Sequence, residues 1–203
     1  MKVFDNTIHH KYSFDTLVYD FAGLFSEKLH ISKDILPYCH KIKEQDQSFA
    51  KNLYSLFDDK DIDILYRTFI RQTIKKYFGY TRVVYQKIPN IKIYYAGFHS
   101  FDCCSNKGIK QNDSDTITII LPLTNMYDTN TIWLETNQNS GLLKPVNIAY
   151  GEYLAFCQQN LIRDFRRNDT GHSSVFLEFM FTSYDSYKNT INSLILDSTA
   201  SIL

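Results

Sequence analysis

The spacing of apolar residues changes at Gly79, and this change divides the chain into two parts. Before Gly79, apolar residues recur at three- and four-residue steps, the period of an amphipathic helix. Three such runs predict three helices. They are carried by Phe14, Leu17, Val18, Phe21, Leu24 and Phe25, then by Phe49, Leu53, Leu56 and Phe57, and then by Ile62, Leu65, Tyr66, Phe69, Ile74 and Phe78.

Short polar segments separate the three predicted helices. Ser32 to Pro37 indicates a helix start or an irregular joint. The polar run Asp58-Asp59-Lys60-Asp61 ends the second helix, and Gly79 ends the third.

After Gly79 the apolar period is two, which is typical of strands. Pro89-Asn90 predicts a turn that makes the first two strands neighbours, and Asn168-Asp169-Thr170-Gly171 predicts a later turn. We expect residues 185–203 to form a loose terminal helix. The predicted strands are Arg82–Lys87, Ile91–Tyr95, Thr116–Leu123, Asn130–Thr136, Gly141–Val146, Glu152–Cys157 and Ser174–Thr182.

Several short antiparallel strands behind a helical front favour a double-stranded β-helix, a jelly-roll (cupin-like) barrel. The chain has 203 residues, a length that suits one domain. We expect a helical flank over 1–79, the barrel over 80–182 and a tail over 183–203. The polar segment 97–115 has no clear period, and long loops of this kind are often functional.

Composition excludes several classes of protein. Lys+Arg and Asp+Glu balance at 22 each, so nothing indicates binding to nucleic acid or to an anionic membrane. We see no signal-like or membrane-spanning apolar run, and we expect a cytoplasmic protein. Cys39, Cys103, Cys104 and Cys157 form no C-x-x-C or zinc-finger spacing. We read them as reduced thiols, with a reactive vicinal pair at Cys103-Cys104 as the alternative.

Four segments carry a resemblance to a known family. They are Gln86–Ile93, Leu121–Thr136, Gly151–Phe156 and Asn168–Gly171. The Leu-Pro-Leu-Thr…Thr-Asn-Thr-x-Trp-x-Glu block within Leu121–Thr136 is the most specific. The chain resembles the iron- and 2-oxoglutarate-dependent oxygenases found in streptomycin-type and other small-molecule gene clusters.

The resemblance implies a set of ligand positions that this chain fills with other residues. In the family, two His and one carboxylate hold Fe(II), and a basic residue binds the far carboxylate of 2-oxoglutarate. The His-x-Asp pair falls near Cys104-Ser105-Asn106, the distal His at Arg163 and the basic residue at Ser174. A thiolate can bind iron, but Asn is a weak ligand and Arg cannot ligate. A hydroxyl at Ser174 gives 2-oxoglutarate no charge partner. We therefore expect no metal and no cofactor.

A shifted alignment keeps an alternative metal site open. His99 and Asp102 lie in the same polar segment, with Asp113 and Asp115 further along. The His-x-x-Asp spacing does not place both side chains on one face of a strand, as a two-residue step does. His172 follows Gly171, and we read it as a solvated turn residue.

Other residues are candidates for the pocket. Arg163 is either a solvated residue of a strand edge or a cation that points into the former iron cavity and binds an anion through its planar fork of donors. Strand alternation places one of Tyr94 and Tyr95 in the core and the other inside the barrel. Trp133 and Glu135 occupy family positions, Trp133 as core or pocket wall.

Three functions remain open. The first is a metal-free barrel that binds or acts on a small polar or anionic metabolite in a biosynthetic pathway. The second is an active Fe(II)- and 2-oxoglutarate-dependent hydroxylase or related oxygenase. The third is a non-catalytic partner of an active paralogue, and a homodimer or another partner protein is compatible with each. No Gly-x-Ser-x-Gly, phosphate-binding loop or His-Glu-x-x-His motif points elsewhere.

Overall fold

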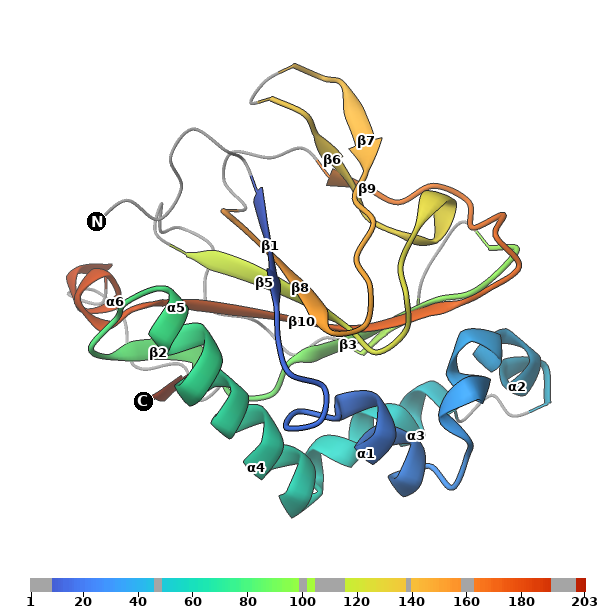
Figure 1. Ribbon diagram of the computed structural model, residues 1–203, viewed down its shortest axis with the longest axis horizontal. Coiled ribbons are helices and arrows are strands. Elements are labelled where there is room, and N and C mark those ends of the chain that lie inside the picture. Colours follow the sequence, from blue (N-terminus) through green and yellow to red (C-terminus); the bar gives the residue numbers. More distant parts are fainter. Residues whose placement is uncertain are drawn as a thin grey trace.

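Two facing antiparallel sheets, with helices against the outer face of the larger one, make up the protein (Figure 1). The computed structural model describes residues 9–45, 49–98, 102–104, 116–137, 140–157, 163–190 and 200–203. The first part of the chain contains β1 (His9–Ser13), α1 (Phe21–Lys28), η1 (Lys33–Tyr38), α2 (Cys39–Gln45), α3 (Phe49–Ser55), η2 (Leu56–Asp58), α4 (Lys60–Phe69), η3 (Ile70–Ile74) and α5 (Lys75–Tyr77). The second part contains β2 (Val83–Gln86), β3 (Asn90–Tyr94), β4 (Asp102–Cys104), β5 (Ile117–Pro122), η4 (Asp128–Asn130), β6 (Trp133–Glu135), β7 (Leu143–Pro145), β8 (Glu152–Cys157), β9 (Arg163–Asp164), β10 (Ser174–Ser183), α6 (Tyr184–Thr190) and β11 (Ala200–Ile202).

The larger sheet is built around β10. Within the described residues it has the order β1-β8-β5-β10-β2-β11, with β3 pairing β10 and β4 pairing β3. The smaller sheet has the order β7-β6-β9 and faces the larger one. β1 and β11 come from outside the expected barrel range of 80–182, so both ends of the chain add strands to the larger sheet.

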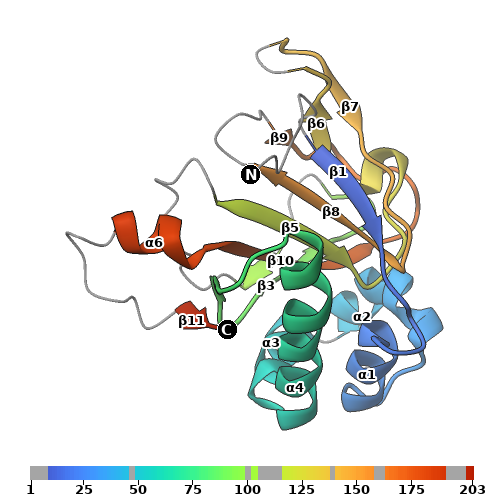
Figure 2. The same ribbon diagram turned by 60° about the vertical axis from the view of Figure 1, so that its left-hand side comes forward.

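Strand alternation divides the interior into two cores. On β10, Val175, Leu177, Phe179 and Phe181 pack with the helices, whereas Phe176 faces the smaller sheet. Helices α1, α3 and α4 cover the outer face of the larger sheet (Figure 2). Residues of both sheets fill the second core, which lies between them: Ile120, Met126, Ile132, Leu134, Val146, Ile148, Leu154, Phe156 and Phe176. The side chains of Ser174, Phe176 and Glu178 therefore point into the barrel, whereas Met180 on the same face packs with Val84 and α6.

The first predicted helix is wrong in its first half. Residues 9–13 form β1, and α1 begins only at Phe21. The Asp15 side chain accepts a hydrogen bond from Leu17 N at 2.8 Å, and Asp20 caps α1 by accepting from Gly23 N. Leu17 and Val18 are 94% and 57% exposed, so a turn replaces the helix there. The hydrogen bonds from the backbone to the Asp15 and Asp20 side chains stabilise this turn and cap, although the apolar spacing predicts a helix.

The second and third predicted helices are confirmed. The second is α3 followed by the 3-10 turn η2. The third begins behind Asp59, whose side chain accepts hydrogen bonds from Asp61 N and Ile62 N. Its middle turn, η3, is a π-helix, and the helix ends before Gly79, which has φ +65°. Glycine adopts this left-handed conformation without steric cost.

Three predictions for the second half of the chain need correction. β2 and β3 do not pair as neighbours but lie in succession along β10, whose residues 181–183 and 174–178 they contact. The segment 97–115 includes the short strand β4, which pairs with β3. The predicted terminal helix is present as α6, but Ala200–Ile202 pairs with β2 as a strand. In the described part of the chain, no helix has both the length and the apolar character to span a membrane.

Candidate functional site

A buried ion pair lies on the barrel-facing side of the larger sheet. Lys92 is on β3 and Glu178 is on β10, and the register pairs Lys92 with Phe176 and Glu178 with Asn90. The two charged side chains are therefore diagonal neighbours across two paired strands. Lys92 Nζ lies 2.9 Å from Glu178 Oε2, and the side chains are only 7% and 8% exposed.

Arg163 joins this pair from the opposite sheet. It lies on β9 opposite Leu134 of β6, and its Nη1 is 3.1 Å from the same Glu178 Oε2. Its side chain is 26% exposed, so the guanidinium lies between the ion pair and solvent. We call Lys92, Glu178 and Arg163 the charged triad.

The charged triad leaves polar groups unused. Both cations bond to Oε2, and among the residues that the structure describes, Glu178 Oε1 accepts no hydrogen bond. Arg163 has five N–H donors, of which one bonds to Glu178. The arrangement thus offers a fixed acceptor beside several donors, the groups that orient a small polar ligand.

Two described positions test whether the iron centre of the resembled family fits this barrel. Arg163 stands where the distal His is expected, and its guanidinium, a permanent cation that cannot ligate, donates to Glu178. Ser174, where the basic residue is expected, is fully buried and donates its hydroxyl to Asn130 O at 2.7 Å. Within the described residues, no group of three His, Cys, Asp or Glu is arranged to hold a metal. These positions do not fit Fe(II) and 2-oxoglutarate.

The remaining positions of that site fall where the structure gives no side chains. Asn106 and His99 lie outside the described residues. Asp102 and Cys104 belong to β4, of which only the backbone is described.

The two candidate tyrosines lie on opposite faces of the sheet, as their alternation predicts. Tyr95 packs in the core against the helices. Tyr94 points into the barrel and contacts Phe165 edge-on, with ring centroids 5.7 Å apart. The Tyr94 hydroxyl is buried without a hydrogen-bond partner in the described part of the chain. Burial, and then the charges of Asp164 and Asp169, raises the pKa of Tyr94 to about 12.

Trp133 and Glu135 lie on the face of β6 opposite the barrel interior, because Leu134 between them belongs to the inner core. Arg166 stacks over the Trp133 ring at 3.9 Å from its centroid. Glu135 is buried and accepts a hydrogen bond from Gly141 N at 2.8 Å, which closes the β6–β7 hairpin.

The residues that carry the resemblance hold loops in place. The Asn168 side chain donates to Tyr94 O and His172 O and accepts from Thr170 N and the Thr170 hydroxyl, which ties the turn before β10 to the end of β3. Thr124 Oγ1 accepts from Val175 N, and the Thr131 hydroxyl donates to Val146 O. These motif residues therefore stabilise the scaffold.

His172 is more tightly held than a solvated turn residue. Its Nδ1 is 2.9 Å from the Tyr127 hydroxyl and its Nε2 is 3.1 Å from the Tyr38 hydroxyl. The imidazole thus connects η1 to the turn before β10.

Lys92 and Glu178 are absent from the sequence-based candidates. A signal for them exists, because each is a charged residue inside a run of apolar strand residues, Ile91 to Tyr95 and Val175 to Phe181. A charge in such a run needs a partner when both faces of the strand are buried. The sequence does not indicate which partner it has.

The fold matches solved structures. One described as CytC3 with Fe(II) and α-ketoglutarate aligns over 88% of this chain and 74% of its own, with 12% identity and a TM-score of 0.55. The chain has the fold of the iron(II)- and 2-oxoglutarate-dependent oxygenases. It is the double-stranded β-helix that the sequence predicts.

Other matches are more distant. A Pseudomonas putida prolyl-4-hydroxylase aligns over 87% of this chain and 93% of its own, with 11% identity and a TM-score of 0.41. HygX from Streptomyces hygroscopicus, solved with nickel and 2-oxoglutarate, aligns over 90% and 84%, with 10% identity and a TM-score of 0.42. No family profile and no curated protein sequence matches the chain. At these identities the likeness concerns the fold alone.

Proposed function

We propose that the protein is an oxygenase-fold barrel that binds a small anionic metabolite at Arg163 without iron or 2-oxoglutarate. The observation that carries this proposal is the charged triad. A guanidinium at the distal ligand position repels a metal ion, whereas its planar donors suit a carboxylate or phosphate. Glu178 holds Arg163 by Nη1 and so orients the remaining donors.

The partial exposure of Arg163 supports a ligand that arrives from solvent. Lys92 and Glu178 are nearly inaccessible, so the anionic group contacts Arg163. A hydroxyl or ammonium group on the same ligand can donate to Glu178 Oε1 and gains a second contact. A small polar metabolite of a biosynthetic pathway has this chemistry.

A panel of small anions tests the proposal. We expect phosphate, citrate and simple sugar phosphates to differ in the rise of melting temperature that they cause, with the best of them binding at least about tenfold more weakly to Arg163→Ala. Arg167→Ala is the matched control, because Arg167 is an exposed arginine that pairs with Asp169 at the surface. Equal loss in both variants, or no thermal shift with any anion, contradicts the proposal.

A further inference from the structure

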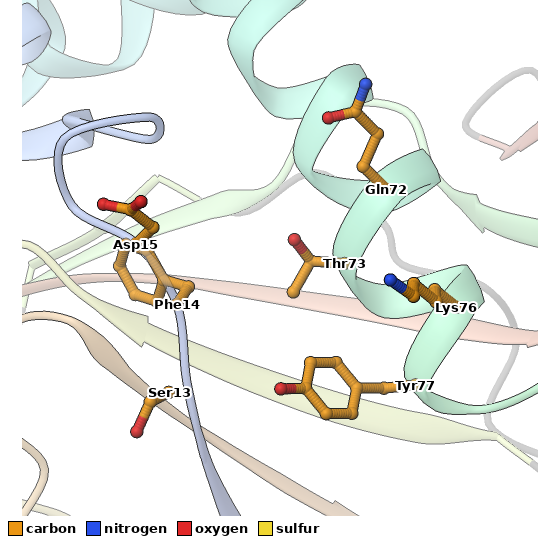
Figure 3. Close-up of a pocket in the computed structure, with 7 residues that line it drawn as sticks. All are labelled: Ser13, Phe14, Asp15, Gln72, Thr73, Lys76 and Tyr77. Atoms are coloured by element: carbon orange, nitrogen blue, oxygen red, sulfur yellow. The ribbon is translucent and has the colours of Figure 1, made fainter.

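A hollow lies between the end of β1 and the helix that runs through η3 and α5, and none of the charged triad lines it (Figure 3). Its volume is about 460 Å³, within the range of small-molecule pockets. One wall is the segment Ser13-Phe14-Asp15, which begins with the last residue of β1, and the other is the helix that runs through η3 and α5. The residues of the second wall are Gln72, Thr73, Lys76 and Tyr77.

Local backbone features shape both walls. Ser13 ends β1, and Phe14 and Asp15 lead into the turn that replaces the predicted helix. Phe14 N donates to Gly151 O at 2.8 Å, which holds this wall to the end of the larger sheet. Gln72 and Thr73 belong to the π-helical turn η3. Such single π-turns are frequent at functional sites. The Tyr19 hydroxyl donates to Gln72 Oε1 at 2.8 Å and so fixes the Gln72 side chain.

Residues of opposite charge lie on the two walls of the hollow. Figure 3 shows Asp15 on one wall and Lys76 on the other. Among the residues that the structure describes, neither Asp15 nor Lys76 has an ion-pair partner, and the Asp15 side chain bonds only to Leu17 N. A compound with an ammonium group at one end and a carboxylate nearby complements this arrangement.

Aromatic rings add an apolar surface between these charges. Phe14 is half-buried, packed edge-on against Phe21 and Phe69. Tyr77 is 60% exposed and extends into the hollow, where its ring also contacts Tyr12. An exposed ring beside polar groups is typical of a ligand wall.

We propose that this hollow binds an α-amino acid with an apolar or aromatic side chain, its ammonium group against Asp15 and its carboxylate against Lys76. The site is separate from the barrel interior and goes beyond the proposed function. Its ligand is recognised by two charges of opposite sign and one apolar group.

Calorimetry with three related compounds tests the charge requirement. L-phenylalanine is expected to bind, whereas L-phenylalaninamide lacks the carboxylate and N-acetyl-L-phenylalanine lacks the ammonium group. Each of these two is expected to bind at least about tenfold more weakly, because each loses one charge-assisted contact. Equal binding of all three, or no binding of L-phenylalanine at millimolar concentration, overturns the proposal.

Variants locate the binding. Lys76→Gln and Asp15→Asn are each expected to weaken L-phenylalanine about tenfold, and Asn retains an acceptor for Leu17 N. Lys75→Gln is the matched control, because Lys75 is the adjacent lysine and does not line the hollow. Arg163→Ala is expected to leave this binding unchanged, which separates it from the barrel site. Full affinity in both Lys76→Gln and Asp15→Asn overturns the assignment.

Discussion

Lys92 and Glu178 form an ion pair inside the barrel, with Nζ 2.9 Å from Oε2 and less than a tenth of either side chain exposed. Burial of an ion pair costs desolvation free energy that the Coulomb attraction offsets only when both partners are present. The pair therefore constrains the barrel interior more than it stabilises the fold. Arg163 contacts the same carboxylate and is partly exposed, so a ligand from solvent can reach the charged triad at this residue.

Removal of one partner is expected to destabilise the protein strongly. Glu178→Leu leaves Lys92 buried without this carboxylate, and we expect it to lower the free energy of unfolding by about 3–5 kcal/mol. The double variant Lys92→Met with Glu178→Leu is expected to regain most of that loss, as measured by urea denaturation.

An exposed ion pair serves as the control for this experiment. Arg67 and Asp63 lie one helical turn apart on α4, and Asp63→Asn is expected to cost no more than about 0.5 kcal/mol. A Glu178→Leu cost as small as that of Asp63→Asn would show that Lys92 and Glu178 are solvated and unpaired.

The buried tyrosines predict a loss of stability in alkali. Burial raises the pKa of Tyr94 to about 12 and that of Tyr66 well above its usual value. Above about pH 10 the unfolded chain loses phenolic protons that the folded protein retains. The folded state then binds more protons, so the free energy of unfolding falls as pH rises from about 10 to 12.

Tyr94→Phe isolates one of these groups. The Tyr94 hydroxyl has no hydrogen-bond partner in the described residues, so stability at neutral pH should change little. Denaturation at pH 8, 9, 10 and 11 is expected to show a shallower decline for this variant. An unchanged decline would place the Tyr94 phenol in contact with water.

Asn168 is expected to be a structural residue. Replacement of Asn168 by Ala removes the hydrogen bond to the buried carbonyl oxygen of Tyr94 and the bonds to Thr170. We expect this to lower the free energy of unfolding by about 2–3 kcal/mol. Asp169→Ala changes the exposed neighbour and should stay within about 0.5 kcal/mol. The folded Asn168→Ala protein should still bind the anion. Complete loss of anion binding in the folded variant would instead show that Asn168 belongs to the anion site.

The corrected start of α1 predicts contrasting effects for two apolar residues. Leu17 is almost fully exposed and Phe21 is fully buried. Leu17→Ser should change the free energy of unfolding by less than about 0.5 kcal/mol, whereas Phe21→Ala should lower it by about 3–5 kcal/mol. Comparable decreases in the free energy of unfolding, measured by thermal denaturation, would show that Leu17 is buried, as in the longer helix that the apolar spacing predicts.

The sequence predicts the fold better than it predicts the ends of the first and last elements. Apolar periods locate α3, α4, β5, β8 and β10, because in these elements local preference and burial agree. The period fails before Phe21, where Asp15 and Asp20 bond the backbone and set a turn and a cap. It also fails at Ala200–Ile202, because pairing with β2 is a long-range contact that no local pattern encodes.

The site could be predicted only in part for a related reason. Arg163 is predicted from the resemblance, which aligns it with the distal ligand position of the family. Lys92 and Glu178 are 86 residues apart and become partners only through the pairing of β3 with β10. Ser174 shows the reverse case, because its position in the motif does not reveal that its hydroxyl is committed to Asn130 O.

The barrel has the oxygenase fold, and we propose that the charged triad takes the place of the iron centre. The most direct measurement is an anaerobic titration of the metal-free protein with Fe(II) and 2-oxoglutarate, followed by absorption spectroscopy and metal analysis. We predict no stoichiometric iron and no iron–2-oxoglutarate charge-transfer band. One iron per chain together with that band would contradict the claim and favour an active oxygenase, with ligands in segments such as His99 to Asp102.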